Sequence, residues 1–286
     1  MSDPVVSTSS AAPFEGFRAL RVERSEHVAE VVLRGPGKGN AMGPDFWREC
    51  PQLFSELGRD DEVRVVLLRG SGAAFCYGLD LLAMAGELGA LAAPGAAAVE
   101  RARLLDVIEG MQRALHAVFS CKKPVVAAVH GWCIGGGLDL AAAADLRVCS
   151  GGARFSLREV KLAIVADVGS LQYLPHLIGE AATRELAFTG KDIDANRALA
   201  LGLVSEVFAD DDALFSGAHR LAQQIADNPP LVVQGIKRVM NRRIEGEIAS
   251  GLREVAAWNA AFLGTEDLGE AVAAFAERRP ARFTGR

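Results

Sequence analysis

The chain of 286 residues carries 31 basic and 36 acidic side chains, for a formal net charge of −5. An acidic balance without a basic cluster argues against nucleic acid as the main partner. Half of the residues are hydrophobic, but only 6% are aromatic and 30 are glycine, so small residues dominate the core. The five cysteines are widely spaced and form no CxxC motif, which indicates reduced thiols and disfavours a zinc site.

The N-terminus has no apolar signal-peptide segment, and residues 1–16 are expected to form a flexible tail. The most apolar stretch, Pro124–Ala144, contains His130, Asp139 and three consecutive glycines. This pattern predicts a buried strand and helix, with no membrane span. The reduced thiols lead us to expect a cytoplasmic protein.

The elements predicted along the chain alternate between strand and helix as far as residue 208. Short β-branched runs predict strands at Val28–Leu33, Val63–Leu68, Pro124–Val129, Leu146–Cys149, Ala153–Phe155 and Val204–Phe208. Apolar residues at helical spacing predict helices at Asp45–Leu57, Val99–Phe119, Leu138–Ala144, Ser170–Ile178, Asp211–Ala226, Pro229–Ile248 and Leu252–Ala276. A glycine-rich turn is expected at Gly35–Gly39, and Pro51 should break its helix or start a new turn.

Alternation of strands and helices predicts a layered α/β core. We place this core at residues 17–208 and a wholly helical region at residues 209–286. Residues 81–98 are rich in alanine, leucine and glycine without a decisive period, and we expect that segment to be mobile or partly helical.

Two glycine-rich segments could present backbone N–H groups to a ligand. Gly135-Gly136-Gly137 lies between a strand and a helix, and free N–H groups at a helix start suit an anion or a developing oxyanion. The loop Ala74–Leu81, which contains Gly78, could supply a second donor. The alternatives are tight helix–strand packing for the first segment and an ordinary turn for the second. A P-loop lysine, GxGxxG, GxSxG and HExxH are all absent.

Three acids lie near the first glycine segment, and each has a structural and a chemical interpretation. Asp139 could serve only the electrostatics of a helix start, Glu159 could pair with Arg158 or Lys161, and Asp167 could cap the following helix. Acids among apolar neighbours are also candidates for shifted pKa values and proton transfer.

Several segments match, in order, the signature of the crotonase (enoyl-CoA hydratase/isomerase) superfamily, which the chain resembles from about Phe17 to its C-terminus. The signature segments are Pro124–Gly131, Ile134–Leu140 and Asp145–Arg147. Within the superfamily the chain is most similar to the Δ3,5-Δ2,4-dienoyl-CoA isomerases, through Asn40–Met42, Asp45–Glu49, Gly78–Leu81, Arg158–Val160, Ala166–Gln172 and Ala257–Asn259. The segment that contains Asp167 is the discriminating one.

The resemblance implies a ClpP/crotonase-like spiral of ββα units, closed by a C-terminal helical trimerisation region. It implies a homotrimer or homohexamer, an acyl-CoA thioester substrate, and neither a metal nor a cofactor, since coenzyme A arrives with the substrate. The backbone N–H groups of Leu79 and Gly136 would form the oxyanion hole. The implied substrate-binding residues are Tyr77, Gly78, Leu79, Asp80, Leu81 and Gly136.

The three acids then suggest a reaction of fatty-acid β-oxidation. Glu159 would remove a proton at C2 of a 3,5-dienoyl-CoA, Asp167 would deliver one at C6, and Asp139 would support the pair. The resembled hydratases usually carry glutamates at the positions of Asp139 and Glu159 and a glycine at that of Asp167. Two alternatives remain: an enoyl-CoA hydratase that adds water to a 2-enoyl-CoA, and a non-catalytic acyl-CoA-binding protein of the same fold.

Overall fold

The protein is described by a computed structural model that covers residues 14, 16–35, 39–93 and 95–286. The predicted tail at residues 1–16 lies outside these ranges apart from Phe14 and Gly16. The middle of the predicted turn at Gly35–Gly39 lies outside them as well.

Within these ranges, the strands form a six-stranded sheet and a three-stranded sheet. The larger sheet has the order β1-β2-β3-β4-β6-β9, with β1 (Leu20–Ser25), β2 (Val28–Leu33), β3 (Val65–Gly70), β4 (Val125–Val129), β6 (Leu146–Ser150) and β9 (Glu206–Phe208). The smaller sheet consists of β5 (Trp132–Ile134), β7 (Arg154–Ser156) and β8 (Asp192–Asp194). In the larger sheet β1 and β2 are antiparallel, and the other neighbours are parallel. Parallel neighbours require crossover connections, which helices provide here.

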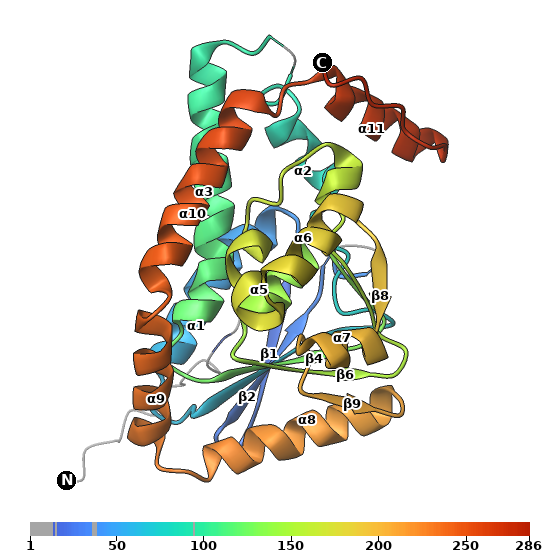
Figure 1. Ribbon diagram of the computed structural model, residues 1–286. Helices are drawn as coiled ribbons and strands as arrows, with labels where there is room; N and C mark the ends of the chain where they lie inside the picture. Colours follow the sequence, from blue (N-terminus) through green and yellow to red (C-terminus); the bar gives the residue numbers. More distant parts are fainter. Residues whose placement is uncertain (1–13, 15, 36–38, 94) are drawn as a thin grey trace, which may run out of the picture.

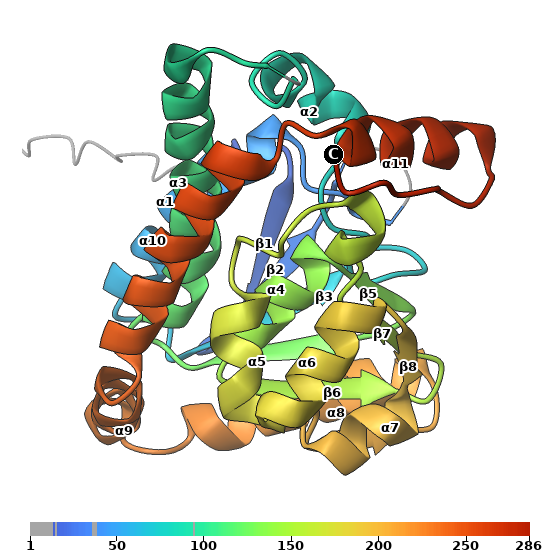
Figure 2. The same cartoon turned by 45° about the horizontal axis from the view of Figure 1, so that its top comes forward.

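The helices surround the larger sheet and extend away from it at the C-terminal end (Figure 1). Those before residue 180 are α1 (Pro44–Arg59), α2 (Leu81–Leu88), α3 (Ala98–Ser120), α4 (Gly136–Ala143), the 3₁₀ helix η1 (Glu159–Leu162) and α5 (Ser170–Ile178). The later ones are α6 (Glu180–Thr189), α7 (Ala195–Leu201), α8 (Asp211–Ala226), α9 (Pro230–Arg242), α10 (Glu245–Phe262) and α11 (Glu266–Glu277). Helices α3 and α10 lie side by side in both views (Figures 1 and 2).

Two clusters of buried side chains hold the layers together. Successive residues of β3 contribute to different clusters, as strand geometry requires: Val66 and Leu68 join the larger cluster, while Val65 and Leu67 pack in the smaller one. The smaller cluster also contains buried residues of α8, which runs beneath the sheet in Figure 1. The first helix of the region 209–286 is therefore a layer of the α/β core.

Three local expectations differ from the structure. Strand β1 was not expected, because its sequence LRVERS is mostly polar and it forms an exposed edge of the sheet. Helix α1 continues through Pro51 without a break, since its apolar face is buried on both sides of the proline. Two long helices were expected after residue 228, but the structure has three, α9, α10 and α11. The helical conformation is interrupted after Arg242 and again at Leu263–Thr265.

The cysteines, all of which lie in described ranges, are buried and carry free thiols. In the part of the chain that the structure covers, no helix is both long and apolar enough to cross a bilayer.

Candidate active site

The two glycine-rich segments predicted to supply N–H donors meet in space. Cys76 and Cys133 pair as an isolated parallel bridge, in which Cys76 N–H donates to Trp132 O (3.0 Å) and Ile134 N–H donates to Cys76 O (3.0 Å). Gly78 has a φ of +82°, and a Cβ there would lie 2.8 Å from Ile134 O. Glycine is therefore required at this close approach.

The N–H groups of Leu79 and Gly136 donate no hydrogen bond within the described ranges. The chain around Leu79 is held by Met42, whose N–H donates to Gly78 O (2.7 Å) and whose carbonyl accepts from Asp80 N–H (3.0 Å). Gly136 is the first residue of α4, where N–H groups have no partner inside the helix. A Cβ built on Gly136 would lie 3.7 Å from Leu79 N. The two free donors are thus close enough to hold one oxygen atom between them.

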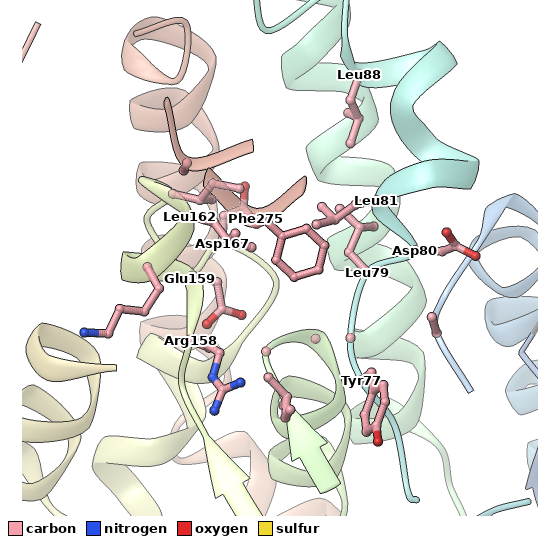
Figure 3. A pocket seen from close by; sticks show the side chains of 18 of the residues that line it. Tyr77, Leu79, Asp80, Leu81, Leu88, Arg158, Glu159, Leu162, Asp167 and Phe275 are labelled. Carbon is pink, nitrogen blue, oxygen red and sulfur yellow. The ribbon is translucent and has the colours of Figure 1, made fainter. Parts of the chain in front are cut away.

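Both donors open onto a cavity of about 1530 Å³. Eight of the nine residues predicted for the site line it: Tyr77, Gly78, Leu79, Asp80, Leu81, Gly136, Glu159 and Asp167. Figure 3 shows Glu159 across the cavity from Leu79 and Leu81. Asp80 points its carboxylate away, because that group caps α2 by accepting from Ala83 N–H (3.0 Å).

The rest of the cavity wall is mostly apolar and comes from distant parts of the chain. Helix α3 contributes Leu104, Ile108 and Met111, which share one face of the helix. Phe275 of α11 projects into the cavity (Figure 3), and Phe283 of the C-terminal segment also lines it. A large apolar cavity with a few polar groups is the usual form of a small-molecule site.

Glu159 lies at the start of η1 and faces Gly135. A Cβ on Gly135 would lie 3.0 Å from Glu159 Oε1, and Oε2 is buried without a hydrogen-bond partner. The surface ion-pair alternative is wrong, because Arg158 pairs with Asp192 instead and no salt bridge of Glu159 occurs in the described ranges. Burial, reinforced by the charge of Asp139, raises the pKa of Glu159 well above its usual value.

Asp167 is held by polar groups from two helices. Its Oδ2 accepts from Asn259 Nδ2 of α10 (2.7 Å), and its main-chain oxygen accepts from Gln112 Nε2 of α3 (2.7 Å). The cap alternative is wrong for this residue, since Gly169 occupies the N-cap of α5 without a side-chain bond. Burial raises the pKa of Asp167 to about 6, although the bond from Asn259 opposes the shift.

Asp139 is fully buried on α4 and is the one predicted catalytic residue that does not line the cavity. Its Oδ1 accepts a hydrogen bond from Ser170 N–H, so Asp139 satisfies the first turn of α5, while its Oδ2 has no hydrogen-bond partner. Burial raises the pKa of Asp139 to about 7. The acids thus divide into two that face the cavity and one behind its wall.

Sequence reasoning assigned no role to Asn259 or Gln112, although both contact Asp167. They lie 92 and 55 residues from Asp167 in sequence, so no local spacing could pair them. The available signal was a polar residue on a buried helix face: Asn259 is 2% exposed and Gln112 is 6% exposed.

A layered α/β fold with two free backbone donors and two half-buried acids around one apolar cavity defines the class of this protein. Residues 23–286 match the family described as enoyl-CoA hydratase/isomerase. The chain therefore belongs to the enoyl-CoA hydratase/isomerase (crotonase) family, and the expected resemblance is confirmed.

Within the family, the chain is similar to proteins named as dienoyl-CoA isomerases. The chain is 40% identical over 281 residues to the mitochondrial Delta(3,5)-Delta(2,4)-dienoyl-CoA isomerase of Dictyostelium discoideum, covering 96% of this chain and 94% of that protein. It is also 40% identical to the peroxisomal Delta(3,5)-Delta(2,4)-dienoyl-CoA isomerase of Arabidopsis thaliana, covering 94% of this chain and 98% of that protein.

Solved structures confirm the expected fold. An enoyl-CoA hydratase/isomerase from Pseudoalteromonas atlantica T6c superposes with a TM-score of 0.81 at 28% identity, covering 93% of this chain and 100% of that one. A putative enoyl-CoA hydratase from Streptomyces coelicolor A3(2) superposes with a TM-score of 0.74 at 32% identity, covering 99% of this chain and 100% of that one.

Proposed function

We propose that this enzyme converts a 3,5-dienoyl-CoA into a 2,4-dienoyl-CoA. The observation that carries the proposal is a second acid, Asp167, on the wall of the cavity that also holds Glu159 and the two free N–H donors. The names of the relatives from Dictyostelium and Arabidopsis support the same reaction. Its driving force is conjugation of the product diene with the thioester, and the only coenzyme involved is the CoA of the substrate.

In the first step the thioester oxygen accepts hydrogen bonds from the N–H groups of Leu79 and Gly136. Glu159 acts in its ionised form, which is a stronger base because its pKa is raised. It removes a proton from C2, and the electron pair of that C–H bond spreads over the thioester oxygen and the diene. Because this negative charge develops in the transition state, donors that are already in place lower the barrier.

In the second step the proton of Asp167 is delivered to C6. The electron pair of the dienolate forms the new C6–H bond, the double bonds move to C2 and C4, and the pair of the O–H bond stays on Asp167. Asp167 must hold its proton when the substrate binds. Its pKa, raised to about 6, favours the protonated form at mildly acidic pH, below about 6.

Asp139 acts from behind the wall in this scheme. Its charge raises the pKa of Glu159 and its Oδ1 holds the start of α5, so it tunes the base and supports its surroundings. A hydratase with Asp139 and Glu159 as its water-activating pair is less well supported, because Asp139 does not line the cavity. The three acids also argue against a protein that only binds acyl-CoA, because binding alone does not require them.

The decisive experiment supplies the purified protein with two substrates. Formation of the conjugated 2,4-dienoyl chromophore from a 3,5-dienoyl-CoA supports the proposal. If hydration of a 2-enoyl-CoA is the main activity, the protein is an enoyl-CoA hydratase and the proposal is wrong. If the protein binds acyl-CoA but turns over neither substrate, it is a non-catalytic acyl-CoA-binding protein and the proposal is also wrong.

Replacing the distal acid tests its role. D167N keeps an oxygen able to accept from Asn259 but has no acidic proton, so dienoyl-CoA isomerisation should fall roughly 10²- to 10⁴-fold. KM should change little, because the side chain keeps its shape. An isomerisation rate equal to that of the wild type would contradict the role of Asp167.

The proposal also covers the oligomeric state of the protein and its location in the cell. We expect a homotrimer or homohexamer built through the C-terminal helices, with analytical ultracentrifugation as the measurement. A cytoplasmic location also stays a prediction, and the relatives named above are described as mitochondrial or peroxisomal.

A further inference from the structure

Asn259 is the side chain that contacts the carboxylate of the distal acid. It lies on α10, is 2% exposed, and does not line the cavity. Its Nδ2 donates to Oδ2 of Asp167 at 2.7 Å and to the main-chain oxygen of Val165 at 2.8 Å. The amide therefore reaches Asp167 from the side away from the substrate.

These two bonds fix which end of the Asn259 amide faces the acid. The carbonyl of Val165 can only accept, so the group that faces it must be the nitrogen, and both amide hydrogens are then in use. The oxygen that accepts best in a protonated carboxyl group is its carbonyl oxygen. Oδ2 of Asp167 is therefore kept as the carbonyl oxygen, which leaves Oδ1 to carry the proton.

We propose that Asn259 is the positioning residue of the distal acid: it holds Oδ2 so that Oδ1 presents the proton to C6 of the substrate. This inference rests on the proposed function. During the transfer the Oδ1–H bond breaks, the C6–H bond forms, and the negative charge appears on a carboxylate that already accepts a hydrogen bond. Charge-assisted hydrogen bonds are stronger than neutral ones, so Asn259 favours the state reached after proton delivery.

Other charges around Asp167 act on the same proton and must be separated from the effect of Asn259. Asp139 and Glu159 both interact with the charge of Asp167. Among the residues that the structure describes, the other charged ones on the cavity wall are Asp80, Arg158, Lys161 and Arg279. Substitution of Asn259 leaves every one of these groups in place, so a change in the titration of Asp167 reports on the amide.

The test compares Asn259→Leu, which keeps a similar size without a donor, with Gln112→Met as the matched control. Gln112 also donates two hydrogen bonds, to the main-chain oxygens of Asp167 (2.7 Å) and Leu252 (2.8 Å), but none to the carboxylate. Asn259→Ala is the second variant if the leucine variant does not fold. The readouts are the pH profile of dienoyl-CoA formation and a carbon-13 NMR titration of Asp167 in the free protein.

We expect Asn259→Leu to lower kcat about 10-fold or more, since a mispositioned acid transfers its proton poorly. The alkaline limb of the profile and the NMR midpoint of Asp167 should both move up by about one pH unit, because the carboxylate has lost a donor. Gln112→Met should move neither midpoint, even where it lowers thermal stability.

The possible failures can be told apart. A wild type that makes no 2,4-dienoyl-CoA overturns the proposed function and, with it, the delivery role of Asn259. An active wild type whose Asn259→Leu variant keeps its kcat and both midpoints overturns the positioning role alone. Equal midpoint shifts in Asn259→Leu and Gln112→Met also overturn it, since they indicate a general loosening of the segment.

Discussion

At the scale of single residues, the site depends on backbone conformations that few side chains tolerate. Gly135 has φ +54° and ψ −125°, and the space for a Cβ there is taken by the carboxylate of Glu159, with Oε1 at 3.0 Å. Glycine at this position therefore fixes both the turn that presents Gly136 N–H and the place of the proposed base.

Gly135→Ala should displace Glu159 and lower kcat roughly 10- to 100-fold, because small shifts of a catalytic group have large effects on rate. Strain at the positive φ should also destabilise the fold by about 1 to 2 kcal/mol. Steady-state kinetics and thermal melts measure the two effects. Gly152→Ala is the control, since a Cβ there meets open space and should change neither. Wild-type kinetics in Gly135→Ala would contradict this account of the turn.

At the scale of elements, packing overrides local preference in α1. Pro51 lies inside this helix, where proline lacks the N–H for a helical bond. The helix persists because residues on both sides of Pro51, including Cys50 and Leu53, are completely buried. The sequence predicts a break in the helix at Pro51, but burial of the residues on both sides keeps the helix continuous.

Pro51→Ala should restore the missing bond and raise the free energy of unfolding by about 1 to 2 kcal/mol, after allowing for the greater freedom of the unfolded chain. Chemical denaturation measures this difference. Pro44→Ala is the matched control in the same helix, because Pro44 occupies the first turn, where proline is well tolerated. A loss of stability in Pro51→Ala would show that the proline is favourable in this context.

At the scale of the whole molecule, the fold holds three carboxyl groups whose pKa values are raised, those of Asp139, Glu159 and Asp167. Each holds its proton to higher pH in the folded state than in the unfolded chain, by burial above all. Between the two pKa values the folded state binds more protons, so stability falls as pH rises. For Asp139 this window runs from about 4 to about 7.

The wild type should therefore lose on the order of a few kcal/mol of stability between pH 5 and pH 8, at about 1.4 kcal/mol for each unit of pKa difference. D139N keeps an oxygen for Ser170 N–H but no ionisable group, so its loss should be clearly smaller. Denaturant unfolding at several pH values measures both proteins. Parallel pH dependences would contradict the assignment of Asp139 as a major buried charge.

The sequence by itself determined the class of fold, the meeting of strand and helix at Gly135–Gly137, and Asp139 and Asp167 as acids with apolar neighbours. It also marked Glu159 as a third candidate acid between them along the chain. These features are local, because a glycine conformation or a helix start depends on residues a few positions apart. The edge strand β1 escaped prediction for the same reason, since only its pairing with β2 makes its polar sequence extended.

Only the tertiary structure decided where the three acids lie relative to the cavity. Asp139 lies outside the cavity wall, whereas Phe275 of α11 is part of it. Asp167 accepts a hydrogen bond from the amide of Asn259, which is 92 residues away in sequence. The physical reason is that side-chain contacts between helices depend on the packing of the whole core. The pattern along the chain records which residues are buried and does not record which of them touch.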